Sequence, residues 1–420
     1  MPSVEGLPAR RAALQMLDAV LRRGQTLDTA AQAGRSLKPA DQGLAVAIAG
    51  EALRHLPDLD ALIDSATRQR LPDDSKARMV LRIALAQKVG LGTPEHALVA
   101  TALPLVDGGP RRLVHGVLGT LLRRGVPPME APRLPDAVEL RWREAWGDDV
   151  VASARRQIAK RPALDLSFVD DAEAKSFAEQ VSGKSLASRH ARLNDAGSVT
   201  ELPGFGGGRW WVQDLAASLP ARLIPKDARD VLDLCAAPGG KTMQMAAAGH
   251  SITAVDQSES RLKRLRENLD RTGLDAKLVT ADALKWKSDR QFDAILLDAP
   301  CSATGTFRRH PEVLYRARPG IIRESAELQL NLLDRAATWL KPRGSLVYAV
   351  CSLEPGEGEN VVSDFLSAHP DFEISPPRPG ELPDFVTPGE RGWSRILPGL
   401  LESDGGLDGF FVARLVRMAT

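Results

Sequence analysis

Cysteine and aspartate are the residues of this chain that could do chemistry, and several of them directly follow short apolar runs. Cys301 and Cys351 each follow such a run closely, and Asp256 and Asp298 do the same. Short apolar runs of this kind are typical of strands buried in a parallel sheet. Ligands of open α/β sheets bind beyond the carboxyl ends of the strands, so these side chains are predicted to meet at one edge.

The stretch 231–242, Val-Leu-Asp-Leu-Cys-Ala-Ala-Pro-Gly-Gly-Lys-Thr, organises this expected site. It predicts a buried strand, a tight turn at Pro238-Gly239-Gly240 and a helix over 242–248. Two glycines let the backbone turn sharply and let a ligand lie close to the main chain. The free N–H groups at the start of the helix suit an anionic or carboxylate-bearing ligand of the nucleotide type.

The spacing of the glycines excludes two common nucleotide sites. A phosphate loop needs glycine five positions before Gly240, where this chain has Cys235, and the dinucleotide pattern G-x-G-x-x-G is absent from the stretch. An acidic residue at the strand end, before a glycine turn, instead favours S-adenosylmethionine, which carries an ammonium and a sulfonium. An ordinary strand-to-helix turn without a ligand remains the alternative.

Further strands are expected over 252–255, 278–279, 292–297 and 345–350, with helices over 259–271 and 324–340 between them. This alternation predicts a mostly parallel sheet. Asp256 is placed to accept hydrogen bonds from a ribose, as carboxylates do in comparable folds. Asp282 and Asp298 stand at the next two strand ends. Four acidic strand ends together with two cysteines are a much stronger signal than one.

The composition limits what the rest of the chain can be. With 420 residues, two or three domains are expected, and a net charge of +1 gives no global nucleic-acid signature. No apolar run is long enough for a membrane span, and the first residues carry no secretory signal. Three cysteines argue against disulfides and for a reducing cytoplasm, and no Cys/His cluster has metal-ligand spacing. We expect a cytoplasmic monomer without a metal.

Residues 1–125 are predicted to form an all-α bundle. Apolar residues recur at helical spacing over 12–21, 41–53, 59–67, 75–89 and 111–124, and a further helix is expected to start at Thr93-Pro94-Glu95. Residues 1–130 hold 17 Lys and Arg against 13 Asp and Glu. Arg111 and Arg112 concentrate part of this charge on the last helix, where it is either a solvated face or a contact with RNA phosphates.

Residues 126–137 carry several prolines and are predicted to be a linker. A small α+β subdomain, with a possible RNA contact, is expected over 138–225. It would contain a helix over 138–158, a strand over 164–169, a helix over 171–181 and further segments over 186–193 and 199–202. Trp210 and Trp211 are expected to pack rather than to stack on bases. Residues 226–420 are then the catalytic domain.

The N-terminal segment resembles NusB-like RNA-binding domains. The resemblance rests on Arg-Arg-Ala-Ala at 10–13, Val-Leu-Arg-Ile-Ala-Leu at 80–85, Glu-His-Ala at 95–97 and Val-His-Gly-Val-Leu at 114–118. In that family the last of these motifs usually has asparagine where this chain has His115. The expected fold is therefore a NusB-like helical bundle, then the small α+β subdomain and a class I, Rossmann-like methyltransferase domain.

Residues 210–418 resemble the RsmB/NOP family of RNA cytosine-5 methyltransferases. The motifs that carry the likeness lie at 233–242, at 298–306 (Asp-Ala-Pro-Cys-Ser-Ala-Thr-Gly-Thr), at 348–352 (Tyr-Ala-Val-Cys-Ser) and at 408–415. Val350 departs from the threonine often found before the second motif cysteine. A Pro-rich insert at 376–388 is expected to be a surface loop. The helical N-terminal module points, within the family, to an enzyme that acts on 16S rRNA.

The resemblance implies roles for individual residues. Cys351 would be the nucleophile that adds to C6 of cytosine, Cys301 would assist release of the product, and Asp298 would hydrogen-bond the N3/N4 edge of the base. The S-adenosylmethionine contacts would be Cys235, Ala236, Ala237, Pro238, Gly239, Gly240, Lys241, Asp256, Asp282 and Asp298. Cys235 would use only its backbone, and Lys241 could contact RNA instead of the cofactor.

A reactive thiolate is favoured by an electropositive site. Arg308, Arg309 and His310 follow Cys301 closely and could supply that charge or hold RNA phosphate. Two rivals to methylation of 16S rRNA stay open. One is the same chemistry on tRNA or 23S rRNA, and the other is a non-catalytic NusB-like RNA-binding factor with a degenerate methyltransferase domain.

Overall fold

The computed structural model describes residues 5–194 and 197–419, and the chain forms two compact units. The first unit holds Met1–Arg161 together with Phe307–Arg316, and the second holds Pro162–Thr306 and Ala317–Thr420. Residues 138–161 and 307–316 group with the helical bundle, whereas we expected 138–225 to form one subdomain.

The first unit is entirely helical, as predicted. Its helices are α1 (Leu7–Arg23), α2 (Leu27–Ala30), α3 (Pro39–Arg54), α4 (Leu56–Ser65), α5 (Lys76–Leu91), α6 (Glu95–Ala102), α7 (Gly108–Arg124), α8 (Asp136–Trp146), α9 (Asp148–Ile158) and α14 (Val313–Arg316), with 3₁₀ turns η1 (Ala31–Gly34) and η2 (Leu103–Leu105). α5 is the centre of the bundle, and every residue from Ala77 to Gln87 is buried. Its start is capped by Ser75 Oγ, which accepts a hydrogen bond from Arg78 N at 3.3 Å.

The N-terminal boundary of α6 differs from the prediction. Pro94, not Thr93, is the residue that precedes the helix, and no side chain caps it. The proline has an extended ψ of 143°, so the first helical residue is Glu95. The acidic side chain of Glu95 lies in the first turn, where it complements the helix dipole.

One predicted helix over 138–158 is in fact two helices, α8 and α9. They are separated at Gly147, whose φ of 85° is outside the range that continues a helix. Trp142 of α8 is fully buried and packs edge-on against Phe307, with 5.4 Å between the ring centroids. The irregular segment before α8 is held to α4, because Arg133 N and Nε donate to the Asp58 carboxylate at 2.8 Å each. These contacts place α8 and α9 in the first unit.

The small sheet of the second unit has the strand order β2-β1-β3. Its elements are β1 (Leu164–Phe168), α10 (Asp171–Gln180), β2 (His190–Leu193), the 3₁₀ turn η3 (Val199–Glu201) and β3 (Trp210–Val212). The segment expected over 199–202 is the 3₁₀ turn η3, and the third strand is formed by Trp210–Val212. Both indoles are buried, so they pack, as expected.

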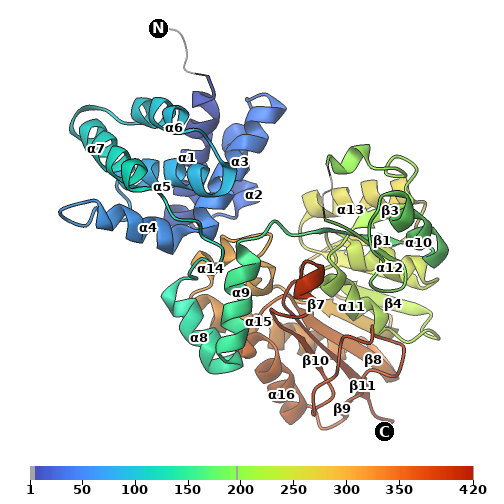
Figure 1. Cartoon of the computed structure of the whole chain (residues 1–420). Helices are drawn as coiled ribbons and strands as arrows, with labels where there is room; N and C mark the ends of the chain where they lie inside the picture. The colour runs from blue at the N-terminus through green and yellow to red at the C-terminus, as the bar shows by residue number, and fades with distance from the viewer. Residues whose placement is uncertain (1–4, 195–196, 420) are drawn as a thin grey trace. The chain divides into compact units, whose positions relative to one another are not determined.

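The large sheet has the order β10-β11-β8-β7-β4-β5-β6, and β9 pairs with β11. Figure 1 labels several of these strands. Its strands are β4 (Asp230–Leu234), β5 (Ser251–Asp256), β6 (Lys277–Thr280), β7 (Phe292–Asp298), β8 (Leu340–Val350), β9 (Phe372–Ile374), β10 (Ser394–Ile396) and β11 (Phe410–Arg417). Strands β4 to β8 are mutually parallel, and β11 is antiparallel to β8. This is the mostly parallel sheet that the sequence predicts.

Helices cover both faces of the large sheet. They are α11 (Leu215–Arg222), α12 (Gly240–Ala247), α13 (Glu259–Thr272), α15 (Pro319–Ala337) and α16 (Glu359–Ala368), and short 3₁₀ turns lie at η4 (Thr304–Thr306), η5 (Pro355–Glu357) and η6 (Glu402–Asp404). Successive residues of a strand enter opposite cores. Val231 packs with Met243 and Leu265 of α12 and α13, whereas Leu232 packs with Leu333 and Phe365 of α15 and α16.

The Pro-rich insert at 376–388 is fastened to the last strand. Arg414 of β11, 2% exposed, donates to Pro376 O at 2.7 Å and to Glu381 Oε1 at 2.8 Å. One buried guanidinium therefore holds a segment without regular structure. Within residues 5–194 and 197–419, none of the helices combines the length and the apolar character that crossing a membrane requires.

Candidate active site

The parallel strands of the large sheet end at one edge, and the register fixes which residues meet there. Leu234 pairs with Val255 on one side and with Leu297 on the other. Asp298, the last residue of β7, pairs with Ala349 of β8. The residues that follow these strand ends, Cys235, Cys301 and Cys351, are therefore brought to the same edge, as predicted.

The turn after β4 has the expected strand–turn–helix form. Packing, rather than ligand approach, explains the glycine at position 239. Gly239 has a φ of 104° and precedes α12. A Cβ at this position would lie 2.0 Å from Leu265 Cδ1, so the glycine allows α13 to pack against the turn. Its role in packing is shown directly by the geometry, whereas a close approach of ligand to this residue stays a prediction.

A cavity of about 430 Å³ opens at this edge. Seven of the predicted site residues line it: Cys235, Ala237, Asp256, Asp282, Asp298, Cys301 and Cys351. Ala236, Pro238, Gly239, Gly240 and Lys241 are not among the lining residues. The lining also includes Gln257, Arg261, Ala283, Leu284, Ala303, Leu328 and Leu332, which the sequence did not single out.

Asp256 is held in place by three donors. Its carboxylate accepts from Ala237 N at 3.2 Å, from Ser258 N at 2.9 Å and from Arg261 Nη2 at 2.9 Å. The first bond connects the end of β5 to the turn after β4. Because about half of the Arg261 side chain is exposed, that arm could exchange for a ligand hydroxyl, whereas the two backbone bonds fix the carboxylate.

Lys241 is ion-paired with a second site residue. Its Nζ lies 2.7 Å from Asp298 Oδ2 and 5.3 Å from the centroid of the Phe410 ring. The lysine side chain is mostly buried, at 11% exposure. In this arrangement Lys241 orients Asp298. The contacts predicted for Lys241 were with the cofactor or with RNA and did not include this ion pair.

The two motif cysteines lie side by side. Cys301 Sγ and Cys351 Sγ are 3.6 Å apart, a distance at which one thiol can donate to the other sulfur. The hydrogen bond with Cys351, reinforced by burial, raises the pKa of Cys301 well above its usual range. Cys301 therefore holds its proton at neutral pH.

The prediction of an electropositive site is wrong for the lining of this cavity. Three carboxylates, those of Asp256, Asp282 and Asp298, face a single guanidinium there. Cys235 shows the consequence, because burial and the nearby Asp256 raise the pKa of its thiol to about 12. Its thiol therefore stays protonated at neutral pH, and the use of its backbone alone stays a prediction.

Asp233 lies in the central motif but was not predicted as a site residue, and it is not among the residues that line the cavity. It is 1% exposed, and its Oδ2 accepts from Thr242 Oγ1 at 2.6 Å. Its Oδ1 is buried and has no hydrogen-bond partner among the residues that the structure describes. Burial raises the pKa of Asp233 to about 7. An unpartnered buried oxygen is costly, and a donor from a ligand would satisfy it.

The predicted RNA contacts fall into two groups. Arg308 is only 3% exposed and packs within the first unit, so it is not an RNA contact of the kind predicted. Arg309, Arg111 and Arg112 are exposed. Arg309 lines a hollow of about 1090 Å³ in the first unit, together with Arg156, Lys160 and Arg161. A basic surface of this kind suits a phosphate backbone.

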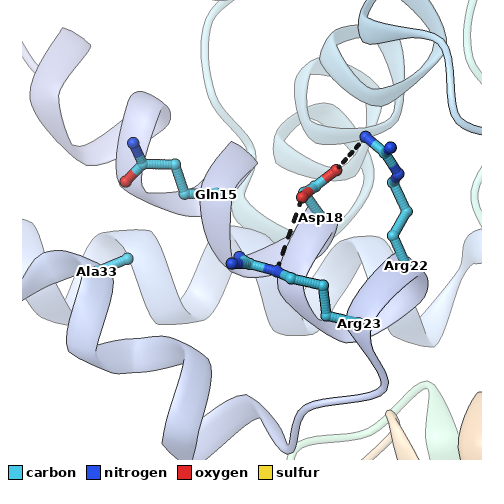
Figure 2. A pocket seen from close by; sticks show the side chains of 5 residues that line it. All are labelled: Gln15, Asp18, Arg22, Arg23 and Ala33. Atoms are coloured by element: carbon cyan, nitrogen blue, oxygen red, sulfur yellow. Dashed lines mark hydrogen bonds and ion pairs between the residues drawn. The ribbon is translucent and has the colours of Figure 1, made fainter.

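Another hollow of the first unit carries no comparable chemistry. It is lined by Gln15, Asp18, Arg22, Arg23 and Ala33, and Figure 2 shows the two arginines converging on one carboxylate. Asp18 lies 3.1 Å from Arg22 Nη1 and 4.0 Å from Arg23 Nε. Among residues 5–194 and 197–419, no group of His, Cys, Asp or Glu could hold a metal ion.

Comparison with known proteins agrees with these two parts of the chain. Residues 220–416 match the model of the 16S rRNA methyltransferase RsmB/F family, and residues 7–123 match the NusB family. The ribosomal RNA small subunit methyltransferase B of Erwinia tasmaniensis is 33% identical over 96% of this chain and 97% of that protein. The protein of the same name from Vibrio vulnificus is 32% identical over 98% of this chain and 99% of that protein.

The chain belongs to the RsmB/F family of rRNA methyltransferases. Solved structures agree on the fold. The crystal structure of PH0851 is 23% identical, with a TM-score of 0.74, and covers 97% of this chain and 98% of its own. A methyltransferase homolog from Pyrococcus horikoshii is 27% identical, with a TM-score of 0.56, over 71% of this chain and 98% of its own. The predicted resemblance, the NusB-like bundle and the Rossmann-like domain are thereby confirmed.

S-adenosylmethionine is the cofactor of an RsmB/F methyltransferase, and the cavity fits it. Three carboxylates line the space, and Asp233 has a buried oxygen without a partner among the described residues. An ammonium and a sulfonium supply the positive charge that such a set of acids lacks.

Proposed function

We propose that this rRNA methyltransferase methylates C5 of a cytosine, most specifically in 16S rRNA, through a covalent bond between Cys351 Sγ and C6 of the base. The observation that carries the proposal is the pair of sulfurs 3.6 Å apart at the ends of β7 and β8. Two thiols are useful in this reaction because one must add to the ring and a second group must help the product leave.

The chemistry begins with Cys351 as a thiolate. Addition of its sulfur to C6 moves electrons onto the ring and makes C5 nucleophilic, and the bound cofactor supplies an electrophilic methyl group. Methylated C5 still carries its original proton. Once a base takes this proton, the C6–S bond breaks, the aromatic ring returns and Cys351 is released as a thiolate. The base would be water or Cys301 after loss of its own proton, and Cys301 Sγ lies 3.6 Å from Cys351 Sγ.

The state of the sulfurs supports this assignment of roles. The raised pKa of Cys301 keeps that thiol protonated, and its sulfur lies within hydrogen-bond distance of Cys351 Sγ, so Cys351 is the sulfur that we propose adds to the ring. Asp298 would meet the N3/N4 edge of the base, and its ion pair with Lys241 fixes where its second oxygen points. The charge that builds up on the ring after addition would then be met by a preorganised partner.

The RNA substrate would be held partly by the first unit. Arg111 and Arg112 of α7 and the exposed Arg309 are the contacts that we propose, the last with its basic neighbours Arg156, Lys160 and Arg161. The relatives from Erwinia tasmaniensis and Vibrio vulnificus are named as small-subunit rRNA methyltransferases, which favours small-subunit rRNA over tRNA or 23S rRNA. Membership in a methyltransferase family argues against the non-catalytic rival.

Trapping the covalent intermediate tests the division of roles. With cofactor and a 16S rRNA transcript, Cys301→Ala should accumulate a protein–RNA adduct that survives denaturing electrophoresis, whereas Cys351→Ala should form none. Wild-type turnover by Cys351→Ala would overturn the assignment. The same assay with 23S rRNA and tRNA transcripts, followed by bisulfite sequencing, identifies the substrate, and 5-methylcytosine confined to either of these would reject 16S rRNA.

A further inference from the structure

A buried carboxylate connects the two loops that carry the motif cysteines. Glu357, in η5, is 0% exposed. Its Oε1 accepts from Ser302 N at 2.7 Å, and its Oε2 accepts from Ser352 Oγ at 2.5 Å and from Ser302 Oγ. Ser302 and Ser352 are the residues that directly follow Cys301 and Cys351. One side chain therefore holds the residue after each cysteine.

A second set of contacts fixes Glu357 itself. Gln329 of α15 donates to Glu357 Oε1 at 3.3 Å and to Pro300 O at 2.8 Å. The hydroxyl of Tyr348, on β8, donates to the backbone oxygen of Glu357 at 2.5 Å. Both partners are buried. The carboxylate thus stands in a network whose members come from β8, α15 and the two cysteine loops.

The chemistry of the network requires acceptors at this position. Among the described residues, the two carboxylate oxygens accept hydrogen bonds from N–H and O–H donors. Burial raises the pKa of Glu357, and the hydrogen bonds from Ser302 and Ser352 work against that rise. An amide in its place would present two hydrogens to donors, which is a repulsive arrangement.

We propose that Glu357 is a positioning residue of the methyl transfer, which holds the Cys301 and Cys351 loops at the separation that the reaction needs. The effect of Glu357 on catalysis rests on the proposed function, whereas its hydrogen bonds to the two cysteine loops do not. The hydrogen bonds of the Glu357 carboxylate go to Ser302, Ser352 and Gln329 and not to either sulfur. It acts through the two serines, and an error of about 1 Å in such a geometry costs on the order of 10²-fold in rate.

Backbone bonds keep the loops folded when the carboxylate is altered. Gly305 N donates to Cys351 O at 3.0 Å, and Gly409 N donates to Gly305 O at 2.8 Å. A Cβ on Gly305 would lie 2.0 Å from Gly409 O, so these segments are closely packed. Glu357→Gln should therefore keep the fold and the cofactor site while it loosens the separation of the sulfurs.

The test combines kinetics with a cross-linking assay that reports the separation of the two sulfurs. In Glu357→Gln, kcat should fall about 10²-fold with little change in KM for RNA. The cross-linking reagent is diamide, whose N=N bond takes two hydrogens from two thiols as they form a disulfide. Peptide mapping by mass spectrometry then gives the rate at which Cys301 and Cys351 cross-link, which should fall several-fold in the variant.

The matched control is Glu381→Gln, which removes a carboxylate paired with a buried arginine in the Pro-rich segment. It should lower stability without changing the cross-linking rate. Unchanged kcat and unchanged cross-linking in Glu357→Gln would overturn the inference. If the wild-type protein cross-linked quickly but made no 5-methylcytosine, the proposed function would fail and the positioning of the sulfurs would stand.

Discussion

Charged side chains are buried in both units, but their partners differ. Between α4 and α5 of the first unit, Arg78 and Arg82 meet Asp60 and Asp64 as opposite charges. At the edge of the large sheet in the second unit, carboxylates outnumber cations, and Asp233 keeps one oxygen without a partner among the described residues. The buried ion pairs of the first unit stabilise its fold. The excess of carboxylates at the sheet edge leaves negative charge that a cationic ligand can neutralise.

The largest effect is expected from breaking the buried ion pairs of the first unit. Arg82 is 3% exposed, and its Nε and Nη2 contact Asp60 Oδ1 and Oδ2 at 2.8 Å each. Arg82→Ala leaves that carboxylate with less compensation and should cost about 3 kcal/mol of the free energy of unfolding of the first unit. Urea unfolding, with hydrogen exchange of the α5 amides as the local probe, measures this loss.

An exposed ion pair of the same unit is the control. Arg22 and Asp18 lie one helical turn apart on α1 and are 55% and 35% exposed (Figure 2). Arg22→Ala should change stability by no more than about 0.5 kcal/mol, because water screens the pair. Equal losses in both variants would mean that burial does not separate the two classes of charge in this protein.

The next effect concerns the unsatisfied carboxylate. Burial raises the pKa of Asp233 to about 7, above its unfolded value, so its contribution to stability is full at low pH and is lost as pH rises toward 7. A cationic ligand beside it favours the ionised form, so cofactor binding should release a proton. Affinity for S-adenosylmethionine should then rise up to about tenfold from pH 6 to pH 8, with little further gain above.

Asp233→Asn separates this linkage from other pH effects. The variant should bind the cofactor more weakly, and its affinity measured by calorimetry should be nearly flat over the same pH range. The proton release measured in two buffers of different ionisation enthalpy should also vanish. A wild-type affinity that does not change with pH would show that the buried oxygen is not coupled to the cofactor.

The residues that meet at the edge of the sheet could be predicted from the sequence, because a residue that follows a parallel strand must lie at that edge. In a parallel sheet every strand ends at the same side, so Cys301 and Cys351 meet although fifty positions separate them. Glu357 could not be found in the same way. Its role arises from hydrogen bonds between two loops, and a glutamate after Pro-Gly has no signal that distinguishes it from a surface residue.

Arg308 shows the opposite error. It follows Cys301 by seven positions, and that proximity suggested a charged neighbour for the thiols or an RNA contact. The chain instead leaves the second unit at Phe307, and Arg308 is buried in the first. Short sequence separation predicts contact only within one element. Which unit a short segment joins depends on partners such as Trp142, which lie far away in the sequence.

The smallest effects should come from exposed cations, which have no part in either buried arrangement. The double variant Arg111→Ala, Arg112→Ala should weaken binding of a 16S rRNA fragment several-fold. The slope of log K against log salt concentration should fall by the equivalent of about one to two phosphate contacts. Arg309→Ala should act in the same direction through the second basic surface. Stability and cofactor affinity should not change, since these side chains lie exposed on the first unit.

Arg22→Ala serves here too, because its charge is partly engaged by Asp18 and should contribute less to RNA binding. Filter binding at several salt concentrations gives both the affinity and the slope. If all four arginines changed the slope equally, the basic charge of the first unit would act as a diffuse field. If Arg111 and Arg112 alone changed it, RNA would follow α7, and a response at Arg309 would extend the path to the hollow beside α9.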